Sequence, residues 1–398
     1  MTNLPQGWEV KKLEEIANIK GGKRLPKGEN LLDNNTKFAY IRVADFQDNG
    51  TINLQNIKFI NENTYNVLKN YKIYDDNLYI SIAGTIGKSG IIPKELNGAI
   101  LTENAVKLEY IQNNISNKFM YFFTLSNIFK TQIQTSTKIV AQPKLAITRL
   151  KQIQIPLPPL KEQERIVGIL DESFAKIDES IKILEQNLLN LDELMQSALQ
   201  KAFNPLKDNA KENYKLPQSW EWKSLEEISE NISAGGDKPK NCTESKTAKN
   251  QIPVYANGVN NNGLVGYTDK ATIIKPSLTI SARGTIGFVC IRKEPYFPIV
   301  RLISLIPCEN ILCLHYLYFC LNFFIAKGEG SSIPQLTIPK FKSLQIPLPP
   351  LKEQEQIAEH LDFVFEKAKA LKELYTKELK DYGELKQSLL DKAFKGEL

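Results

Sequence analysis

The chain has 398 residues, of which 42% are hydrophobic and 24% charged, so it is long enough for two or three folded domains and does not have the composition of a disordered protein. The opening MTNLPQGWEV lacks the apolar core of a signal peptide, no apolar run is long enough to span a membrane, and five irregularly spaced cysteines do not form a disulfide framework, which together predict a cytoplasmic protein. Basic charge is concentrated in two blocks: residues 1–150 hold 19 basic and 13 acidic residues, and residues 204–344 hold 17 and 12. Localised basic blocks favour a polyanionic partner.

Residues 1–152 are predicted to form a first globular domain of the α+β class. Its β-branched and aromatic runs, at 38–46 and 77–84, are typical of strands. The apolar pattern at 118–133 is typical of a helix. The sequence GTIG at 84–87 places glycine where a strand has to turn sharply or approach a neighbour closely.

Residues 153–205 are predicted to form a proline hinge and a long helix. The hinge IPLPPL (155–160) is a stiff extended connector, because proline lacks an amide donor and its φ angle is locked. The helix begins at KEQER (161–165), with acidic residues in its first turn. Apolar residues then recur at alternating spacings of three and four, which predicts a coiled-coil seam. The seam contains Val167, Leu170, Phe174, Ile177, Ile181, Leu184, Leu188, Leu191, Met195 and Ala198.

The second half of the chain repeats this plan. LPQGWEVKKLEEIA (4–17) returns at 216–229, GTIG returns at 284–287, IQIPLPPLKEQERI (153–166) returns at 344–357, and QSALQKAF (196–203) returns as QSLLDKAF (387–394). A second globular domain is therefore expected over 206–343, with strands at 278–284 and 301–307 and a helix at 314–326, followed by a second hinge and helix over 344–398. The second seam is rougher: Leu361, Val364, Ala368, Leu371, Tyr375, Leu379, Tyr382, Leu385 and Leu389.

The repeat predicts how the parts associate. An isolated helix of this length would leave its apolar stripe exposed, so the simplest partner for the first long helix is the second. The alternative is that both are ordinary core helices folded onto the globular domains. Since the joints are repeated and the stretches between them differ, we expect two similar heads with different ligands.

Residue patterns for catalysis or metal binding are weak. GTIGKS (84–89) lacks the first glycine of a phosphate-binding loop, because Ile82 stands there, and the second copy lacks the lysine. Cys308, Cys313, His315 and Cys320 have spacings that do not fit a zinc site and have no counterparts in the first copy, so we expect core residues and no metal. No nucleophile or acid–base constellation is evident, which predicts a protein that is not an enzyme.

Loops that combine cations, amides and glycines are candidates for DNA contacts. Lysine and arginine bind phosphates, while arginine, glutamine and asparagine also pair with base edges. For any one of these residues, the alternative is a solvated surface side chain. The candidates are Lys20, Lys23, Arg24, Lys27, Arg42, Thr85, Lys88, Lys138, Gln142, Lys144, Lys238, Lys240, Arg283, Thr285, Ser331, Ser332 and Gln335.

Taken together, the LPxxWE opening, the GTIG turn, the IPLPPLxEQ hinge with its long helix and the terminal KAFKGEL resemble the specificity subunit of Type I restriction-modification systems. The resemblance implies two target recognition domains that read the halves of a bipartite, asymmetric DNA target, and two helices paired as an antiparallel intramolecular coiled coil that spaces them. It also implies a subunit without catalysis or bound cofactor. Its partners would be double-stranded DNA, two methylating (M) subunits that use S-adenosylmethionine, and motor-nuclease (R) subunits that use ATP and Mg.

Two other functions are compatible with the sequence. The first alternative is a recognition subunit that works by the same logic beside a Type IIB- or IIG-like modification enzyme, which the neighbouring genes would reveal. A coiled-coil scaffold for two protein partners is the other alternative, and a steep salt dependence of duplex binding would argue against it.

Overall fold

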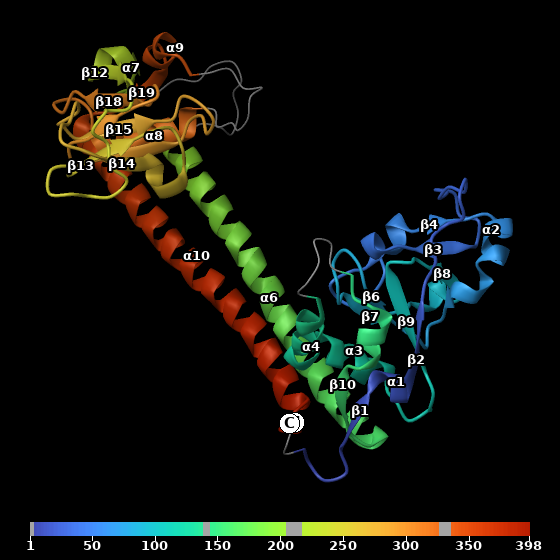
Figure 1. Cartoon of the computed structure of the whole chain (residues 1–398). Helices are drawn as coiled ribbons and strands as arrows, with labels where there is room; N and C mark the ends of the chain where they lie inside the picture. Colours follow the sequence, from blue (N-terminus) through green and yellow to red (C-terminus); the bar gives the residue numbers. More distant parts are fainter. Residues whose placement is uncertain (1–3, 138–143, 204–216, 326–335) are drawn as a thin grey trace. The chain divides into compact units, whose positions relative to one another are not determined.

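The structure is a computed structural model that describes residues 4–137, 144–203, 217–325 and 336–398 (Figure 1). The chain divides into two compact units, one made of residues 1–184 with 377–398 and the other of residues 185–376. Each unit contains one globular part and one end of each long helix. We call the globular parts head 1 (residues 4–159) and head 2 (residues 217–350).

Head 1 combines two small four-stranded sheets with short helices. One sheet has the antiparallel order β2-β9-β6-β7, and the other has the order β4-β3-β8-β5, in which β3 and β8 run parallel. Its elements are β1 (Glu9–Lys12), α1 (Leu13–Ile16), β2 (Ala17–Gly21), β3 (Ala39–Ile41), β4 (Lys58–Phe59), α2 (Glu62–Val67), β5 (Lys72–Ile73), β6 (Leu78–Ser81), β7 (Ser89–Ile91), β8 (Ala99–Leu101), β9 (Ala105–Tyr110), α3 (Asn117–Leu125), α4 (Asn127–Thr137), α5 (Ile147–Lys151) and β10 (Gln154–Leu157).

Head 2 repeats this topology in a shorter form. Its antiparallel sheet β12-β18-β15-β16 corresponds to β2-β9-β6-β7, and its second sheet, β14-β13-β17, lacks a counterpart of β5 within the described residues. Its elements are β11 (Glu221–Ser224), α7 (Leu225–Ile228), β12 (Ser229–Ala234), β13 (Ile252–Tyr255), β14 (Leu264–Thr268), β15 (Ser277–Ile280), β16 (Val289–Arg292), β17 (Phe297–Pro298), β18 (Ile303–Pro307), α8 (Leu314–Phe324), α9 (Ile338–Lys342) and β19 (Gln345–Leu348). The predicted α+β class and internal repeat are confirmed.

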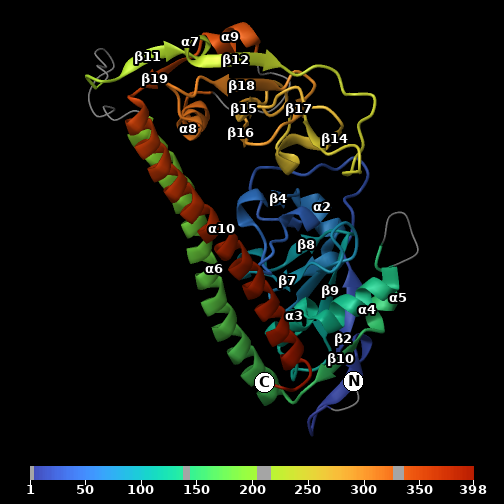
Figure 2. The same ribbon diagram turned by 90° about the vertical axis from the view of Figure 1, so that its left-hand side faces the viewer.

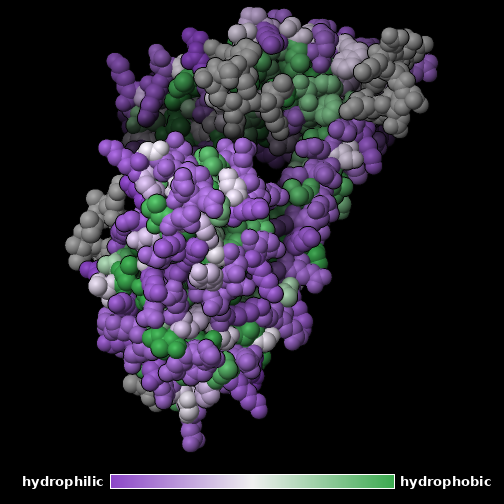
Figure 3. Space-filling model, turned by 90° about the vertical axis from the view of Figure 1, so that its right-hand side faces the viewer, coloured by the Kyte–Doolittle hydropathy of each residue, from purple (hydrophilic) through white to green (hydrophobic). Residues whose placement is uncertain are grey.

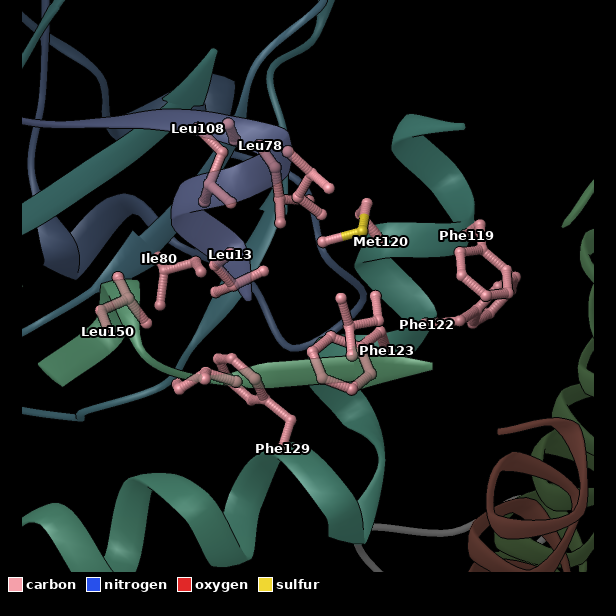
Figure 4. Close-up of a cluster of buried hydrophobic side chains, with 14 of the residues drawn as sticks. Leu13, Leu78, Ile80, Leu108, Phe119, Met120, Phe122, Phe123, Phe129 and Leu150 are labelled. Carbon is pink, nitrogen blue, oxygen red and sulfur yellow. The ribbon is translucent and has the colours of Figure 1, made fainter. Parts of the chain in front are cut away.

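The core of head 1 lies between its antiparallel sheet and helix α3. Strand residues such as Leu78 and Leu108 face the aromatic side chains of α3 and α4 (Figure 4). Phe119, Phe123 and Phe129 from these helices are fully buried. A core of this kind explains why strands with alternate apolar residues and the FMYFF run occur together in the sequence.

The proline hinge is a strand in each head. β10 pairs antiparallel with β1, and β19 pairs antiparallel with β11, each in a two-stranded sheet. Pro156 lies opposite Val10, and Pro347 lies opposite Trp222. Because proline cannot donate to a ladder, it is tolerated in such marginal sheets but not in a central strand. The opening motif and the hinge motif are therefore repeated together because they pair with each other.

A buried glutamine explains the EQ of the repeated hinge motif. Gln163 is 1% exposed, accepts the Ser116 amide at 2.9 Å and donates to the carbonyls of Asn114 and Pro158. Its repeat, Gln354, is fully buried and makes the same three bonds, to the Cys313 amide and to the carbonyls of Ile311 and Pro349. In both units this amide ties the start of a long helix to the loop before the aromatic helix.

The KAF repeat closes the core of each unit. The long helices are α6 (Leu160–Phe203) and α10 (Leu351–Ala393). Phe394 lies just after α10 and packs 5.1 Å from the ring of Phe119 in unit 1, while Phe203 at the end of α6 packs 5.5 Å from Tyr316 in unit 2. Both phenylalanines are almost fully buried. Each helix therefore starts in one head and completes the core of the other.

Helices α6 and α10 pair as an antiparallel coiled coil, side by side in both views (Figures 1 and 2). Lys386 binds Asp178 in unit 1 and Lys372 binds Asp192 in unit 2, so fourteen residues forward along α6 match fourteen residues backward along α10. Along α6, every seventh residue of the predicted seam is buried and the residues between are half-buried. The buried set is Leu170, Ile177, Leu184 and Leu191, and the half-buried set is Phe174, Ile181 and Leu188.

The seam of α10 differs from the prediction at two leucines. Leu361 and Ala368 are buried, and Tyr375, Leu379 and Tyr382 are half-buried. Leu371 and Leu385, however, are 39% and 46% exposed, and the seam continues instead through their neighbours Lys372 and Lys386. The physical reason is the partner helix, which offers Asp192 and Asp178 at these two levels.

The two lysine–aspartate pairs favour pairing between unlike helices. Under the repeat offset of 191 residues, Asp178 corresponds to Lys369 and Asp192 to Gly383. A pairing of α10 with a second α10 would therefore lose both acidic partners. Polar groups at seam positions specify register and partner at some expense of stability.

Replacing Lys372 with leucine is expected to raise the unfolding free energy by roughly 1 kcal/mol, because an apolar seam residue is worth more than a partly exposed ion pair. The unfolding midpoint in urea measures this. Lys377→Leu, at an exposed position of the same helix, is the matched control and should give no gain. A Lys372→Leu protein less stable than the wild type would show that the ion pair contributes more than the seam position.

Candidate nucleic-acid interface

The GTIG turns give both heads the same loop frame. In head 1 the Gly87 amide donates to the Ser81 carbonyl at 2.9 Å, and in head 2 the Gly287 amide donates to the Ser281 carbonyl at 3.0 Å. All four glycines of the two turns have φ between +69° and +88°, a region that other residues rarely adopt. The repeated motif therefore encodes one backbone conformation, at the tips of β6–β7 and β15–β16.

The segment before α5 or α9 is fastened to the same turn. The Leu145 amide donates to Ile82 at 2.8 Å in head 1, and the Leu336 amide donates to Ala282 at 3.2 Å in head 2. Lys144 is exposed directly beside this anchor. The other candidates of these segments, Lys138, Gln142, Ser331, Ser332 and Gln335, lie outside the described residues.

Several candidate cations of head 1 are held by acidic neighbours. Lys20 binds Glu109 at 2.5 Å, Arg24 binds Glu103 at 2.7 Å, and Lys88 binds Asp48 at 2.7 Å. Lys23 lies 5.8 Å from the centre of the Tyr71 ring. Two further candidates, Lys27 and Thr85, are exposed. The local field of head 1 is consequently less positive than its lysine and arginine content indicates.

Arg42 has a structural role that its sequence context does not reveal. Its guanidinium donates to both carboxylate oxygens of Asp45, a residue 1% exposed, and to the Asn56 carbonyl at 3.0 Å. These bonds occupy the planar fork that would otherwise pair with a base or phosphate. Arg42 thus fixes the short helical turn Val43–Asp45.

Arg24 and Glu103 each favour the charged form of the other. The hydrogen bond to Glu103 raises the pKa of Arg24. Burial alone would raise the pKa of Glu103, but hydrogen bonds from Arg24, its own backbone and Thr102 outweigh it, so this pKa lies below its usual value. Glu103 is therefore charged at neutral pH and presents an acceptor beside the GTIG turn.

The candidates of head 2 are distributed differently. Lys238, Lys240 and Arg283 are exposed. Thr285 is not: its hydroxyl oxygen is buried, whereas the equivalent Thr85 of head 1 is exposed. The two GTIG turns therefore have the same residues but differ in the exposure of their threonine side chain.

Head 2 also has an asparagine-rich loop, residues 257–263, that our sequence reasoning missed. Asn257 accepts the Ala282 amide at 2.8 Å, which attaches the loop to the GTIG turn. Asn261 and Asn262 are exposed with φ of 47° and 53°, a conformation that asparagine tolerates better than most residues. Arg292 supports the loop, because its guanidinium donates to the Asn262 carbonyl and stacks 3.5 Å from the centre of the Tyr255 ring. The signal that could have found the loop is the ANGVNNNG sequence itself, which is a dense turn pattern.

A cleft of about 360 Å³ lies beside the GTIG turn of head 1. Its polar lining includes Gln47, Asp48 and Lys130 with Thr85 and Lys88 at the turn, and its apolar lining is formed by Ile86, Leu125, Phe129 and Ile133. The face drawn in Figure 3 is mostly hydrophilic, and its hydrophobic residues occur in small separate groups. This face therefore offers polar contacts rather than a broad apolar docking surface.

Neither a metal cluster nor a membrane helix emerges from the part of the chain that the structure describes. No group of three or more His, Cys, Asp or Glu residues is arranged to hold an ion there. Of the four residues expected in the core, Cys320 is buried, whereas Cys308, Cys313 and His315 are only half-buried and His315 binds Asp362 at 2.6 Å. None of the described helices is both long and apolar enough to cross a membrane.

A family sequence profile, individual protein sequences and solved structures all match this chain. The sequence profile of the Type I restriction modification DNA specificity domain matches residues 5–189 and again residues 217–381. A Mycoplasma pneumoniae protein named as a type I specificity subunit is 29% identical over 357 residues, which cover 88% of this chain and 87% of that protein.

Solved structures support the fold. A chain from a type I R-M system aligns over 100% of both chains with a TM-score of 0.82 and 20% identity. The HsdS subunit from Thermoanaerobacter tengcongensis aligns over 100% of this chain and 98% of its own with a TM-score of 0.61 and 21% identity. The two profile matches correspond to the two repeats of head and helix. The chain belongs to the family of Type I restriction modification DNA specificity domain proteins.

Proposed function

We propose that this chain is the specificity subunit of a Type I restriction-modification complex and reads a bipartite, asymmetric DNA target, one half with each head. Family membership supports a role in DNA-target recognition. The observation that carries the finer proposal is the contrast between shared frames and different loops: both heads keep the GTIG turn and its anchors, while the side chains around the turns differ. A palindromic target would require matching heads.

The coiled coil is the spacer between the half-sites in this proposal. Helix α6 has 44 residues and α10 has 43, so at about 1.5 Å per residue each is roughly 65 Å long. Their lysine–aspartate pairs hold a single register, which would hold the gap between half-sites constant.

Catalysis belongs to partner subunits in this proposal. Two methylating subunits would bind S-adenosylmethionine and modify the target, and motor-nuclease subunits would use ATP and Mg for cleavage. This chain would bind double-stranded DNA and these subunits, without a cofactor of its own. The exposed faces of α6 and α10, rich in acidic residues, are the surface we assign to the methylating subunits.

Exchange of residues 1–152 for those of a relative is expected to change one half of the methylated sequence and leave the other half and the gap unchanged. Mapping methylated adenines across the genome, with the wild-type chain, with the exchanged chain and without either, measures this. The exchanged head must retain the aromatic residues that receive Phe394. Alteration of both half-sites would contradict separate reading, and methylation that does not depend on the chain would contradict the function itself.

A further inference from the structure

The tight turn between β17 and β18 of head 2, which belong to different sheets, has an unfavourable backbone conformation. The Leu302 amide donates to the Ile299 carbonyl at 3.1 Å, and the two central residues, Val300 and Arg301, have φ of 53° and 60°. Two positive φ angles define a type I′ turn, which is normally formed by asparagine and glycine. A β-branched valine is a genuine outlier there. Such outliers persist only where the surrounding structure imposes them, and they gather at functional sites.

Three neighbouring contacts impose this turn. The Val300 and Arg301 amides donate to the carbonyls of Gly236 and Gly235, each at 2.8 Å. A Cβ atom on Gly235 would lie 2.6 Å from the Ile299 nitrogen, so only glycine fits beside the turn. Asn257 donates its side-chain amide to the Val300 carbonyl at 2.6 Å. The turn is thereby joined to the asparagine-rich loop and, through Asn257, to the GTIG turn.

Head 1 has the same turn position with a different conformation and charge. There the Ala105 amide donates to the Thr102 carbonyl at 3.2 Å, and the central residues are Glu103 and Asn104, neither of which has a positive φ. The flanking frame is shared, since Gly22 bonds Ala105 as Gly235 bonds Leu302. The Ile82 amide bonds the Asn104 carbonyl directly, whereas the equivalent Ala282 amide bonds the Asn257 side chain. Asn257 thus replaces a backbone contact and accompanies the altered turn.

Packing does not account for this strain. Val300 is 50% exposed and Arg301 is exposed, so neither side chain contributes to the core. Within the described residues, no hydrogen bond or ion pair holds the Arg301 guanidinium, in contrast to Arg24 and Arg42 of head 1. The conformation places Arg301 at the tip of the turn, beside the asparagine-rich loop and the GTIG turn.

We propose that this turn is the base-reading element of head 2, and that Arg301 contacts a base edge in the half-site of that head. The inference rests on the proposed function. An arginine whose backbone is fixed can direct its guanidinium to O6 and N7 of guanine, the commonest specific contact in the major groove. A phosphate contact does not require such placement, because a flexible cation suffices for it. The equivalent turn of head 1 has Asn104 where head 2 has Arg301, and its Glu103 is bound to Arg24, so the two turns differ in the side chains that they offer.

The test uses the full chain in its complex with the methylating subunits and maps the methylated sequences. Arg301→Ala is expected to relax one position of the half-site read by head 2, lowering discrimination there roughly 5- to 150-fold, the value of one bidentate base contact. The half-site read by head 1 should stay unchanged, which shows that the complex is assembled and active. Arg301→Lys should not restore discrimination, because lysine keeps the charge but lacks the fork.

Two variants serve as controls. Val300→Gly should retain the target sequence, because glycine adopts the positive φ without strain. Lys270→Ala removes another exposed cation of head 2 and should alter neither half-site. If Arg301→Ala fails to assemble, Arg301→Gln provides the same test with less loss of side-chain volume.

An unchanged target sequence in Arg301→Ala would overturn the inference, as would full restoration by Arg301→Lys, which would show that the guanidinium fork is not what reads the base. Either result would leave the proposed function intact, because methylation would still depend on the chain. Methylation independent of the wild-type chain would instead overturn both.

Discussion

Replacing Phe394 with alanine is expected to lower the unfolding free energy of unit 1 by about 3–5 kcal/mol, the usual loss for a large aromatic side chain removed from a core. Phe394 is 1% exposed, and its ring lies 5.1 Å from Phe119 and 5.5 Å from Phe123. The cavity would open where the end of α10 meets head 1, so the helix end should also lose its attachment. Urea unfolding of the full chain, followed by tryptophan fluorescence and circular dichroism, measures both effects.

The matched control lies on the same helix. Phe363 is 60% exposed, and Phe363→Ala should change the unfolding free energy by no more than about 0.5 kcal/mol. Phe203→Ala should reproduce the large loss in unit 2, because Phe203 fills the equivalent place beside Tyr316. Equal unfolding midpoints for Phe394→Ala and Phe363→Ala would refute the view that the helix ends complete the cores.

Replacing Gln354 with alanine is expected to lower the free energy of unfolding by about 2–5 kcal/mol, although the residue is polar. The substitution leaves the Cys313 amide and the carbonyls of Ile311 and Pro349 without their buried partner. Each buried backbone group without a partner costs about 1–3 kcal/mol, unless water reaches it. The loss should appear in the urea midpoint of the full chain and in faster amide exchange at Cys313.

Gln356 provides the comparison, because it lies two residues further along the same helix and is exposed. Gln356→Ala should leave the midpoint unchanged. Gln354→Glu should fail to rescue, since a carboxylate keeps the acceptor for Cys313 but loses both donors and buries a charge. A Gln354→Glu protein as stable as the wild type would contradict the role of the two donated bonds.

The sequence predicts the architecture well, because its repeated motifs lie where the heads connect to the long helices. The hinge motif pairs with the opening motif, as β10 with β1, and its glutamine is buried at the start of the helix in both units. The two motifs therefore recur for one physical reason. Their roles were not visible in the sequence, since a glutamine in a charged helix normally predicts a solvent-exposed side chain.

The helix seam was predicted less accurately in α10 than in α6. The spacing of aliphatic residues favours Leu371 and Leu385. Alternating steps of four and three residues from Leu361 reach Lys372 and Lys386 instead. A pattern that counts only apolar residues cannot recognise a seam lysine whose partner is an aspartate on another helix. The acidic residues at 178 and 192, also fourteen apart, were the available signal.

The candidate interface was the least predictable part. Charge composition identified Arg24 and Arg42, but neighbouring carboxylates that are distant in sequence or buried hold both. Arg301 was overlooked because it lies within PIVRLISLIP, an apolar run without the glycine or asparagine that signals a turn. Tertiary contacts of Gly235, Gly236 and Asn257 create that turn, and no local pattern contains them.

The exchange of core-closing phenylalanines has a consequence for how such proteins diversify. Both long helices end in the same three letters, KAF, and each delivers its phenylalanine to the aromatic helix of the head that the other helix began from. A recombined gene that imports a foreign head therefore has to preserve one aromatic socket and one hinge strand. Loops outside that socket and the GTIG turns are not held by these constraints, so under the proposed function a new target sequence could arise in a single recombination event.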